Sequence, residues 1–292
     1  MKAAEYLASS DKEGTVRVIF LDPETPTGRS TDEVCRFSRV TTIFGSKRNS
    51  RRCGCGEFAS HDAGAAYILN AGTNMQTSLE SIALSQKFPF VFAAAGIHPY
   101  DCAFIEESVD SAIAEIEPLL SDPAVRAIGE IGLDYHYDGI DREKQKEYFI
   151  AQLELARTTG MPVVIHDRDA HGDIYDILRR FPDVTAVLHS FSGSAEAARQ
   201  LSSDGRYISF SGTVTYKNAR NIHEAAAVVP DDLILCETDA PYLPPVPHRG
   251  KINSSAYLPH TISAIAEIRE ASPEAVAELT MNNAVRLFGF DR

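Results

Sequence analysis

The chain has 292 residues, of which 44% are hydrophobic and 24% charged, and its formal net charge is −13 at pH 7. These proportions are ordinary for a globular protein in water, and the length suits one large barrel domain of ~250 residues. The acidic balance argues against a protein that coats long nucleic-acid duplexes through a basic face. A nucleic-acid substrate would therefore be held locally, by metal ions and a few basic side chains.

Short apolar runs alternate with helix-like segments from residue 66 onward. The runs are nearly continuous in apolar residues, which is typical of strands buried on both faces of a parallel sheet. They lie at 66–72, 90–96, 124–132, 161–166, 184–190, 206–212 and 233–239. The segment VRVIFL at 16–21 reads as one more strand, at the start of the barrel. Eight parallel strands can close into a (β/α)8 TIM barrel.

Segments with helical periodicity separate the predicted strands, at 142–160, 194–205 and 272–289. This alternation predicts βαβ units and one α/β domain over 1–292. An open, doubly wound sheet is the alternative, but no GxGxxG or GxxxxGK[ST] motif follows a strand, which disfavours its nucleotide-binding versions. Residues 22–64 show neither the helical period of 3.6 nor the strand period of 2. They form an atypical segment, expected to be disordered or poorly packed.

The five cysteines form no repeated CxxC framework, which favours reduced thiols in a cytoplasmic protein. No signal-peptide pattern or run of about 20 apolar residues is present, so we expect no membrane contact. Cys53, Cys55, Cys35 and His61 offer the donors of a zinc site, but their spacing fits no common zinc module. A monomer or weak oligomer is expected.

Acidic and imidazole side chains lie where the predicted strands end, namely His98, Glu130, His166, His189 and Asp239. The carboxyl ends of all strands in a parallel barrel meet on one face, so these side chains are expected to converge there. Imidazole and carboxylate together suit Zn or Mn, and additional oxygen ligands suit Mg. One histidine ending a buried strand is usually a core residue, but five such residues indicate a metal-dependent hydrolase.

Other histidines and tyrosines have weaker functional interpretations. His136, His171, His223 and His260 are expected at the surface, with a contact to the site as an alternative for His171. Tyr135 and Tyr242 are expected either to stack on a base or to pack against neighbouring side chains.

Five segments resemble, in order, the motifs of the TatD family of metal-dependent deoxyribonucleases, in the metallo-dependent hydrolase superfamily. They are GIHPYD (96–101), IGEIGLDYHYD (128–138), PVVIHDRDA (162–170), LHSFSGS (188–194) and ETDAPYLPPVPHRGKIN (237–253). The resemblance runs from about Ala66 to the C-terminus. It implies a distorted (β/α)8 barrel that hydrolyses DNA phosphodiester bonds with one or two divalent ions, Mg, Mn or Zn. DNA or a short oligonucleotide would be the substrate, usually cleaved from a 3′ end.

The resemblance also implies roles for individual residues. Glu130 resembles the carboxylate that touches both metals, and His166 and His189 resemble imidazole ligands of one metal. Asp239 resembles the acid that binds the other metal and activates water, which makes Glu130 and Asp239 the expected catalytic residues.

Three residues resemble the substrate-binding part of the family site. His98 matches a histidine that faces the substrate. Arg249 and Lys251 lie in a loop that would hold phosphate oxygens, and an ordinary solvated loop is the alternative for this pair.

The chain departs from the family pattern at its first strand, which normally ends in an Asp-Thr-His-x-His-like motif. No HxH occurs in this sequence, and Asn253-Ser254-Ser255 stands where the family tends to have Asn-Glu-Pro. The number of ions is therefore open, although Glu130, His166 and His189 are enough to hold one ion with an open position. An amidohydrolase-like enzyme acting on a small molecule and a non-catalytic barrel remain alternatives.

Overall fold

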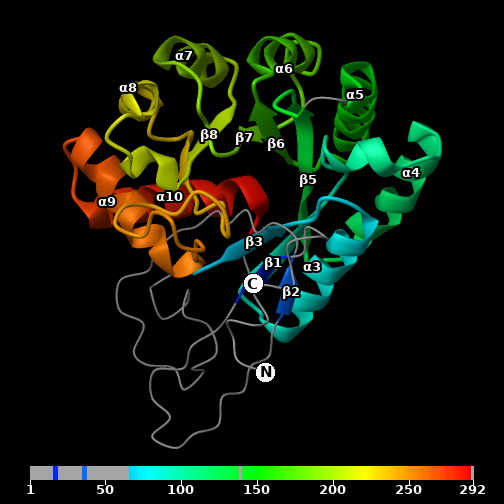
Figure 1. The fold of residues 1–292 in the computed structure, drawn as a ribbon, viewed down its shortest axis with the longest axis horizontal. Coiled ribbons are helices and arrows are strands. Elements are labelled where there is room, and N and C mark those ends of the chain that lie inside the picture. Colours follow the sequence, from blue (N-terminus) through cyan, green and yellow to red (C-terminus); the bar gives the residue numbers. More distant parts are fainter. Residues whose placement is uncertain (1–15, 19–34, 38–65, 138–139, 291–292) are drawn as a thin grey trace, which may run out of the picture.

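A computed structural model of the chain describes residues 16–18, 35–37, 66–137 and 140–290. Seven parallel strands form one sheet in sequential order, and this sheet is curled (Figure 1). They are β3 (Ile68–Ala71), β4 (Val91–Ala95), β5 (Val125–Asp134), β6 (Val163–Arg168), β7 (Ala186–Leu188), β8 (Tyr207–Phe210) and β9 (Ile234–Cys236). The strand order contains no reversal, which identifies the TIM-barrel class and excludes a doubly wound sheet. Each of the seven runs predicted from residue 66 onward overlaps one strand.

The prediction that 16–21 forms the first barrel strand was wrong. Val16–Val18 (β1) pairs antiparallel with Cys35–Phe37 (β2) in a separate two-stranded sheet. A short apolar run indicates a strand but does not determine which segment it pairs with or in which direction. The other residues of the atypical segment 22–64, including Cys53, Cys55 and His61 of the zinc-site hypothesis, lie outside the described residues.

Helices connect the strands, and α5, α6, α7 and α8 follow one another around the outer side of the sheet (Figure 1). The helices are α3 (Met75–Lys87), α4 (Val109–Ile116), α5 (Arg142–Thr159), α6 (His171–Leu178), α7 (Ala195–Ser203), α8 (Arg220–Val228), α9 (Leu258–Ile268) and α10 (Pro273–Phe288). Short 3-10 turns are η1 (Asp101–Phe104), η2 (Glu117–Ser121), η3 (Gly212–Thr215) and η4 (Ser255–Tyr257).

The three helices predicted from sequence are present and end where their capping residues indicate. Ser194 and Ser272 accept hydrogen bonds from the backbone amides of α7 and α10, which satisfies donors that a helix start leaves free. Gly160 and Gly289 close α5 and α10 in the left-handed conformation that glycine adopts without strain.

The end of α10 packs against side chains of the barrel interior. Phe92 stacks on Phe290 at a ring-centroid distance of 4.6 Å. Val164 and Val187, in the same hydrophobic cluster, precede His166 and His189 by two residues and so point to the same side of their strands. The interior is therefore apolar below the carboxyl ends of the strands, and the predicted metal ligands lie above this apolar layer.

Within the described ranges, no helix has the length and hydrophobicity needed to cross a bilayer. The cytoplasmic location stays a prediction.

Candidate metal centre

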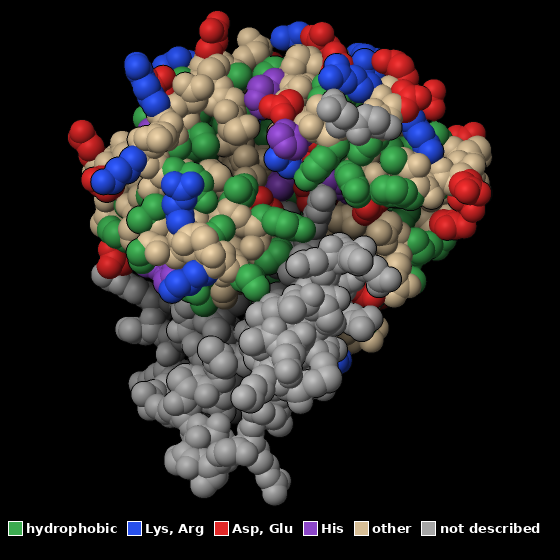
Figure 2. Space-filling model, viewed as in Figure 1, with side chains coloured by type: hydrophobic (Ala, Val, Ile, Leu, Met, Phe, Trp, Pro, Cys, Tyr) green, Lys and Arg blue, Asp and Glu red, His purple; other side chains and the backbone are tan. Residues whose placement is uncertain are grey.

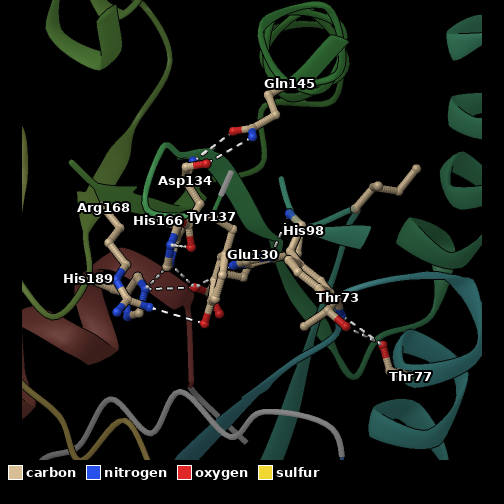
Figure 3. A network of polar contacts seen from close by, with 12 residues as sticks. Thr73, Thr77, His98, Glu130, Asp134, Tyr137, Gln145, His166, Arg168 and His189 are labelled. Carbon is tan, nitrogen blue, oxygen red and sulfur yellow. Dashed lines mark hydrogen bonds and ion pairs between the residues drawn. The ribbon is translucent and has the colours of Figure 1, made fainter. Parts of the chain in front are cut away.

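Glu130 lies among three histidines at the carboxyl ends of neighbouring strands (Figure 3). Its Oε1 is 2.7 Å from His166 Nδ1, 2.8 Å from His189 Nε2 and 3.6 Å from His98 Nε2. The Glu130 side chain is buried, so its charge faces these imidazoles rather than solvent. Residues separated by up to 91 positions, from 98 to 189, thus meet at one point, as expected for barrel strand ends.

Gly132 allows β5 to pass close to the backbone of His166. The two residues are register partners in neighbouring strands, and Gly132 has a φ of +136°. A Cβ atom at this position would lie 2.0 Å from the His166 carbonyl oxygen. Only glycine fits here, and it places β5 and β6 close enough for Glu130 and His166 to meet.

Asp134 holds the far side of the His166 ring. Its Oδ2 lies 3.0 Å from His166 Nε2, and its Oδ1 accepts the His136 backbone amide at 3.0 Å. The backbone of Asp134 is tied to the Gln145 side chain by two hydrogen bonds of 2.8 and 2.9 Å. Because Nε2 is engaged by a carboxylate, Nδ1 is the nitrogen that His166 presents to Glu130.

Glu237 orients the His189 ring in the same way as Asp134 orients His166. Its Oε1 lies 3.2 Å from His189 Nδ1 and accepts the Ser190 backbone amide at 2.7 Å. Its Oε2 accepts the Ser209 hydroxyl at 2.7 Å, and the residue is fully buried. His189 therefore presents Nε2 to Glu130.

Sequence reasoning missed Asp134 and Glu237, although a signal for both was present. Asp134 lies four positions after Glu130 in β5, and Glu237 lies two positions before Asp239. Because side chains two or four positions apart lie on the same face of a strand, each acid could be expected beside the predicted ligands.

The charges of this cluster are strongly coupled. Burial alone would raise the pKa of Glu130, but His189, His166 and His98 hold it well below its ordinary value. Burial would lower the pKa of His166 and His189, but Asp134 and Glu130 raise the first, and Glu130 and Glu237 raise the second. Glu130 thus stays ionised, which is the form that binds a cation.

His98 presents a hydrogen-bond donor to the centre. Its Nδ1 accepts the Tyr100 backbone amide at 3.0 Å, so the proton of the neutral ring sits on Nε2, which faces Glu130. Ligand atoms of His98, Glu130 and His166 lie within 4.8 Å of one another, close enough to share an ion. However, the hydrogen bond at Nδ1 leaves the proton on Nε2, and a protonated Nε2 has no lone pair for a metal. This arrangement suits the substrate-facing role expected for His98.

Asp239 follows β9 with a left-handed φ of 54°, a conformation that aspartate tolerates better than most residues. Burial raises its pKa to about 7, Glu237 and Glu130 add to the rise, and His189 and His166 oppose it. Asp239 is thus coupled electrostatically to the residues around Glu130. A bound cation would favour its charged form.

The predicted phosphate-binding residues, Arg249 and Lys251, lie on the loop that follows Asp239 in the chain. The Arg249 guanidinium covers the Tyr216 ring at 4.4 Å, and both Arg249 and Asp239 influence the pKa of Tyr216, which burial raises. Lys251 is exposed, and its backbone amide donates to the His248 carbonyl at 3.1 Å. The phosphate-binding role of Arg249 and Lys251 stays a prediction.

Among the remaining histidines, His136 is exposed and pairs with Asp169, while His171 is partly exposed and bonds Asp167 at 2.7 Å. His223 and His260 lie on α8 and α9 and are partly exposed, like His171. The His223 ring bonds the Val214 carbonyl of η3 at 2.8 Å.

The donor set fits a divalent ion. His166 Nδ1 and His189 Nε2 lie 3.4 Å apart and face the same Glu130 oxygen, while the far nitrogen of each ring is held by a carboxylate. Imidazoles held in this way, together with carboxylates, are the usual ligands of catalytic Zn and related metals. Whether these residues bind the ion stays a prediction.

The comparisons with known proteins agree with this chemistry. Residues 56–289 match the family described as TatD related DNase. YabD of Bacillus subtilis, named as an uncharacterized metal-dependent hydrolase, is 39% identical over 223 residues, which are 76% of this chain and 86% of YabD. An uncharacterized metal-dependent hydrolase of Mycobacterium tuberculosis is 41% identical over 206 residues, 68% of this chain and 76% of that protein. The crystal structure of YJJV, a TatD homolog from Escherichia coli, has a TM-score of 0.74 at 29% identity and covers 79% of this chain and 89% of its own.

The fold and the site define a metal-dependent hydrolase of the TIM-barrel class. The chain belongs to the TatD family. The family and the fold class expected from the sequence motifs are thereby confirmed.

Proposed function

We propose that this protein hydrolyses phosphodiester bonds of DNA with one or two divalent ions, Mg, Mn or Zn, and removes nucleotides from a 3′ end. The observation that carries this proposal is the convergence of His166 and His189 on Glu130, with each imidazole oriented by its own carboxylate. The family description and the substrate-facing donor of His98 support phosphate rather than amide chemistry.

Glu130, His166, His189 and Asp239 would hold the ion. A bound divalent ion polarises the phosphoryl group and makes a water molecule acidic near neutral pH. His98 Nε2–H donates a hydrogen bond to a phosphate oxygen, and Asp239 accepts the proton of the attacking water. Arg249 and Lys251 bind the remaining phosphate oxygens and orient the strand.

Replacing Asp239 tests the proposed base. Asp239→Asn keeps the side-chain shape but accepts no proton, so we expect turnover to fall by about 100-fold or more. Asp232→Asn is the matched control, because it removes an exposed carboxylate just before the same strand. Near-normal turnover in Asp239→Asn would remove this residue from the mechanism.

Single-stranded oligonucleotides labelled at either end test the substrate and the direction of cleavage. With Mg²⁺, Mn²⁺ or Zn²⁺, a 5′-labelled strand should shorten stepwise, and a 3′-labelled strand should release its label at once as a mononucleotide. Internal cuts would contradict the proposed polarity. Turnover of cyclic amides without any turnover of phosphate esters would instead identify an amidohydrolase acting on a small molecule.

A further inference from the structure

Tyr100, Phe104 and Tyr137 form a group of aromatic side chains, here called the aromatic rim. The ring centroids of Tyr100 and Phe104 lie 5.4 Å apart and those of Tyr100 and Tyr137 lie 5.3 Å apart, with the rings inclined at 58° and 66°. Phe104 is 70% exposed and Tyr137 is 43% exposed. Rings packed edge to face leave ring faces open to solvent, so the aromatic rim presents flat apolar surface for a ligand.

The aromatic rim adjoins the candidate metal centre. The backbone amide of Tyr100 donates to His98, and Tyr137 follows Asp134 by three residues. The Tyr137 hydroxyl accepts a hydrogen bond from Arg168 at 3.4 Å, and Arg168 belongs to β6, two residues after His166. Figure 3 shows Tyr137 and Arg168 in the same close view as Glu130, and Figure 2 shows hydrophobic side chains beside a hollow that contains histidines.

We propose that the aromatic rim stacks on nucleobases of the strand that the centre cleaves, a proposal that rests on the proposed function. Every nucleobase has a π face, so stacking on aromatic side chains binds single strands of any sequence. The Arg168 guanidinium lies 5.4 Å from the centre of the Tyr137 ring and adds a positive charge beside the stacked base.

The charge of the chain makes this contribution necessary. A net charge of −13 repels a polyanion at long range, so phosphate contacts alone supply little affinity. Stacking does not depend on net charge and is worth about tenfold in affinity for each base. The aromatic rim thus supplies affinity that the acidic surface lacks.

Tyr135 and Tyr242, which the sequence suggested for base stacking, differ from these rings. The Tyr135 hydroxyl donates to Asp173 at 2.6 Å and its ring lies under the Arg142 guanidinium at 4.3 Å, so this side chain is used in packing. Tyr242 is 44% exposed on the loop that carries Arg249. The aromatic rim, in contrast, joins three rings next to His98.

The proposal is tested with Phe104→Ala and Tyr137→Ala and with trinucleotides whose last base is either 2-aminopurine or absent. Leu79→Ala is the matched control, because Leu79 is an apolar side chain of α3 with 44% exposure. Binding is measured by quenching of 2-aminopurine fluorescence, which reports stacking, in an Asp239→Asn background that holds the substrate uncleaved. Cleavage by otherwise unmutated enzyme gives KM and kcat.

In the Asp239→Asn background, protein with an intact aromatic rim should quench 2-aminopurine, and each rim variant should bind the base-containing trinucleotide about tenfold more weakly. KM should rise by a similar factor with little change in kcat, while the abasic trinucleotide and Leu79→Ala show no such change. Unchanged binding and KM in both folded rim variants would overturn the proposal. The exposed rings would then be interpreted as a contact surface for another protein. Failure of wild-type enzyme to cleave any trinucleotide would instead count against the proposed function, since quenching still reports stacking.

Discussion

His166 and His189, two of the three histidines that face Glu130, each have one nitrogen bonded to another carboxylate, Asp134 for His166 and Glu237 for His189. A neutral imidazole has one protonated nitrogen and one lone pair, so an acceptor at one nitrogen leaves the lone pair at the other. The two acids therefore determine which imidazole nitrogens are available as metal ligands.

Asp134→Asn tests this control of the lone pair. The amide of the new side chain can donate to His166 Nε2, which would move the ring proton to Nδ1 and remove the lone pair that faces Glu130. We expect metal affinity to fall about 10- to 100-fold, measured by competition with a fluorescent chelator.

The control is Asp169→Asn, which changes an exposed carboxylate that pairs with His136 on the same side of the barrel. Both variants replace a carboxylate that pairs with a histidine. Equal metal affinity of the two variants would show that Asp134 does not orient His166.

At the scale of elements, the site depends on how closely β5 and β6 approach. Gly129 lies against Val164, and Gly132 lies against His166, with no space for a side chain at either position. The glycines that the IGEIG motif contains are therefore part of the site, although they bear no functional group. They let Glu130 reach the histidine of the next strand.

Gly132→Ala should lower the free energy of unfolding by about 3 kcal/mol, because the backbone conformation is strained for alanine and its Cβ would meet the His166 carbonyl. Chemical denaturation measures the change, and metal affinity should fall with it. Gly172→Ala in α6 is the control, since a Cβ there has no atom within 4 Å. A Gly132→Ala protein as stable as this control would contradict the close approach.

The loop that carries Arg249 and Lys251 is anchored by stacked rings. His248 lies on Tyr257 with a centroid distance of 3.8 Å, and its Nε2 is 3.2 Å from His260 Nε2. Burial lowers the pKa of His248 below its ordinary value of 6.5, and His260 and Lys251 add to this effect. The folded protein thus favours the neutral ring.

A lowered histidine pKa means that unfolded chains bind the proton first, so stability is lost as pH falls through about 6.5. His248→Phe keeps a flat ring on Tyr257 and removes the titration. We expect wild-type protein to lose more unfolding free energy than His248→Phe between pH 7.5 and 5.5, measured by denaturation at each pH. Parallel curves for the two proteins would exclude this contribution.

The fold from residue 66 onward could be predicted because its buried strands are continuous apolar runs. The convergence of Glu130, His166 and His189 could be predicted because they lie near the carboxyl ends of these runs. The pairing partner of Val16–Val18 could not be predicted, since an apolar run does not reveal which segment it pairs with. The tautomer of His98 could not be predicted either, because it depends on a hydrogen bond from one backbone amide two residues away. Pairing and hydrogen-bond direction are properties of the folded chain.

At the scale of the whole molecule, the interior has two parts with opposite requirements. The cluster with Phe92, Val164 and Phe290 needs only burial, whereas the cluster around Glu130 gathers buried acids and imidazoles that are costly to remove from water. A divalent ion bound there would offset this cost, because its positive charge would balance the negative charge of the carboxylates. Metal binding and global stability should therefore be coupled.

Removal of metal should lower the melting temperature of the whole domain. An ion present at 100 times its Kd stabilises the folded state by about 2.7 kcal/mol, which corresponds to roughly 5 °C or more for a chain of this size. Scanning calorimetry of chelator-treated protein, before and after addition of Mn²⁺, measures the shift.

Mn²⁺ is preferred over Zn²⁺ because thiolates of the cysteine-containing N-terminal part bind Zn²⁺ better. Glu130→Gln should lose most of the shift and Asp232→Asn should keep it, whereas a shift of equal size in both variants would place the ion away from Glu130.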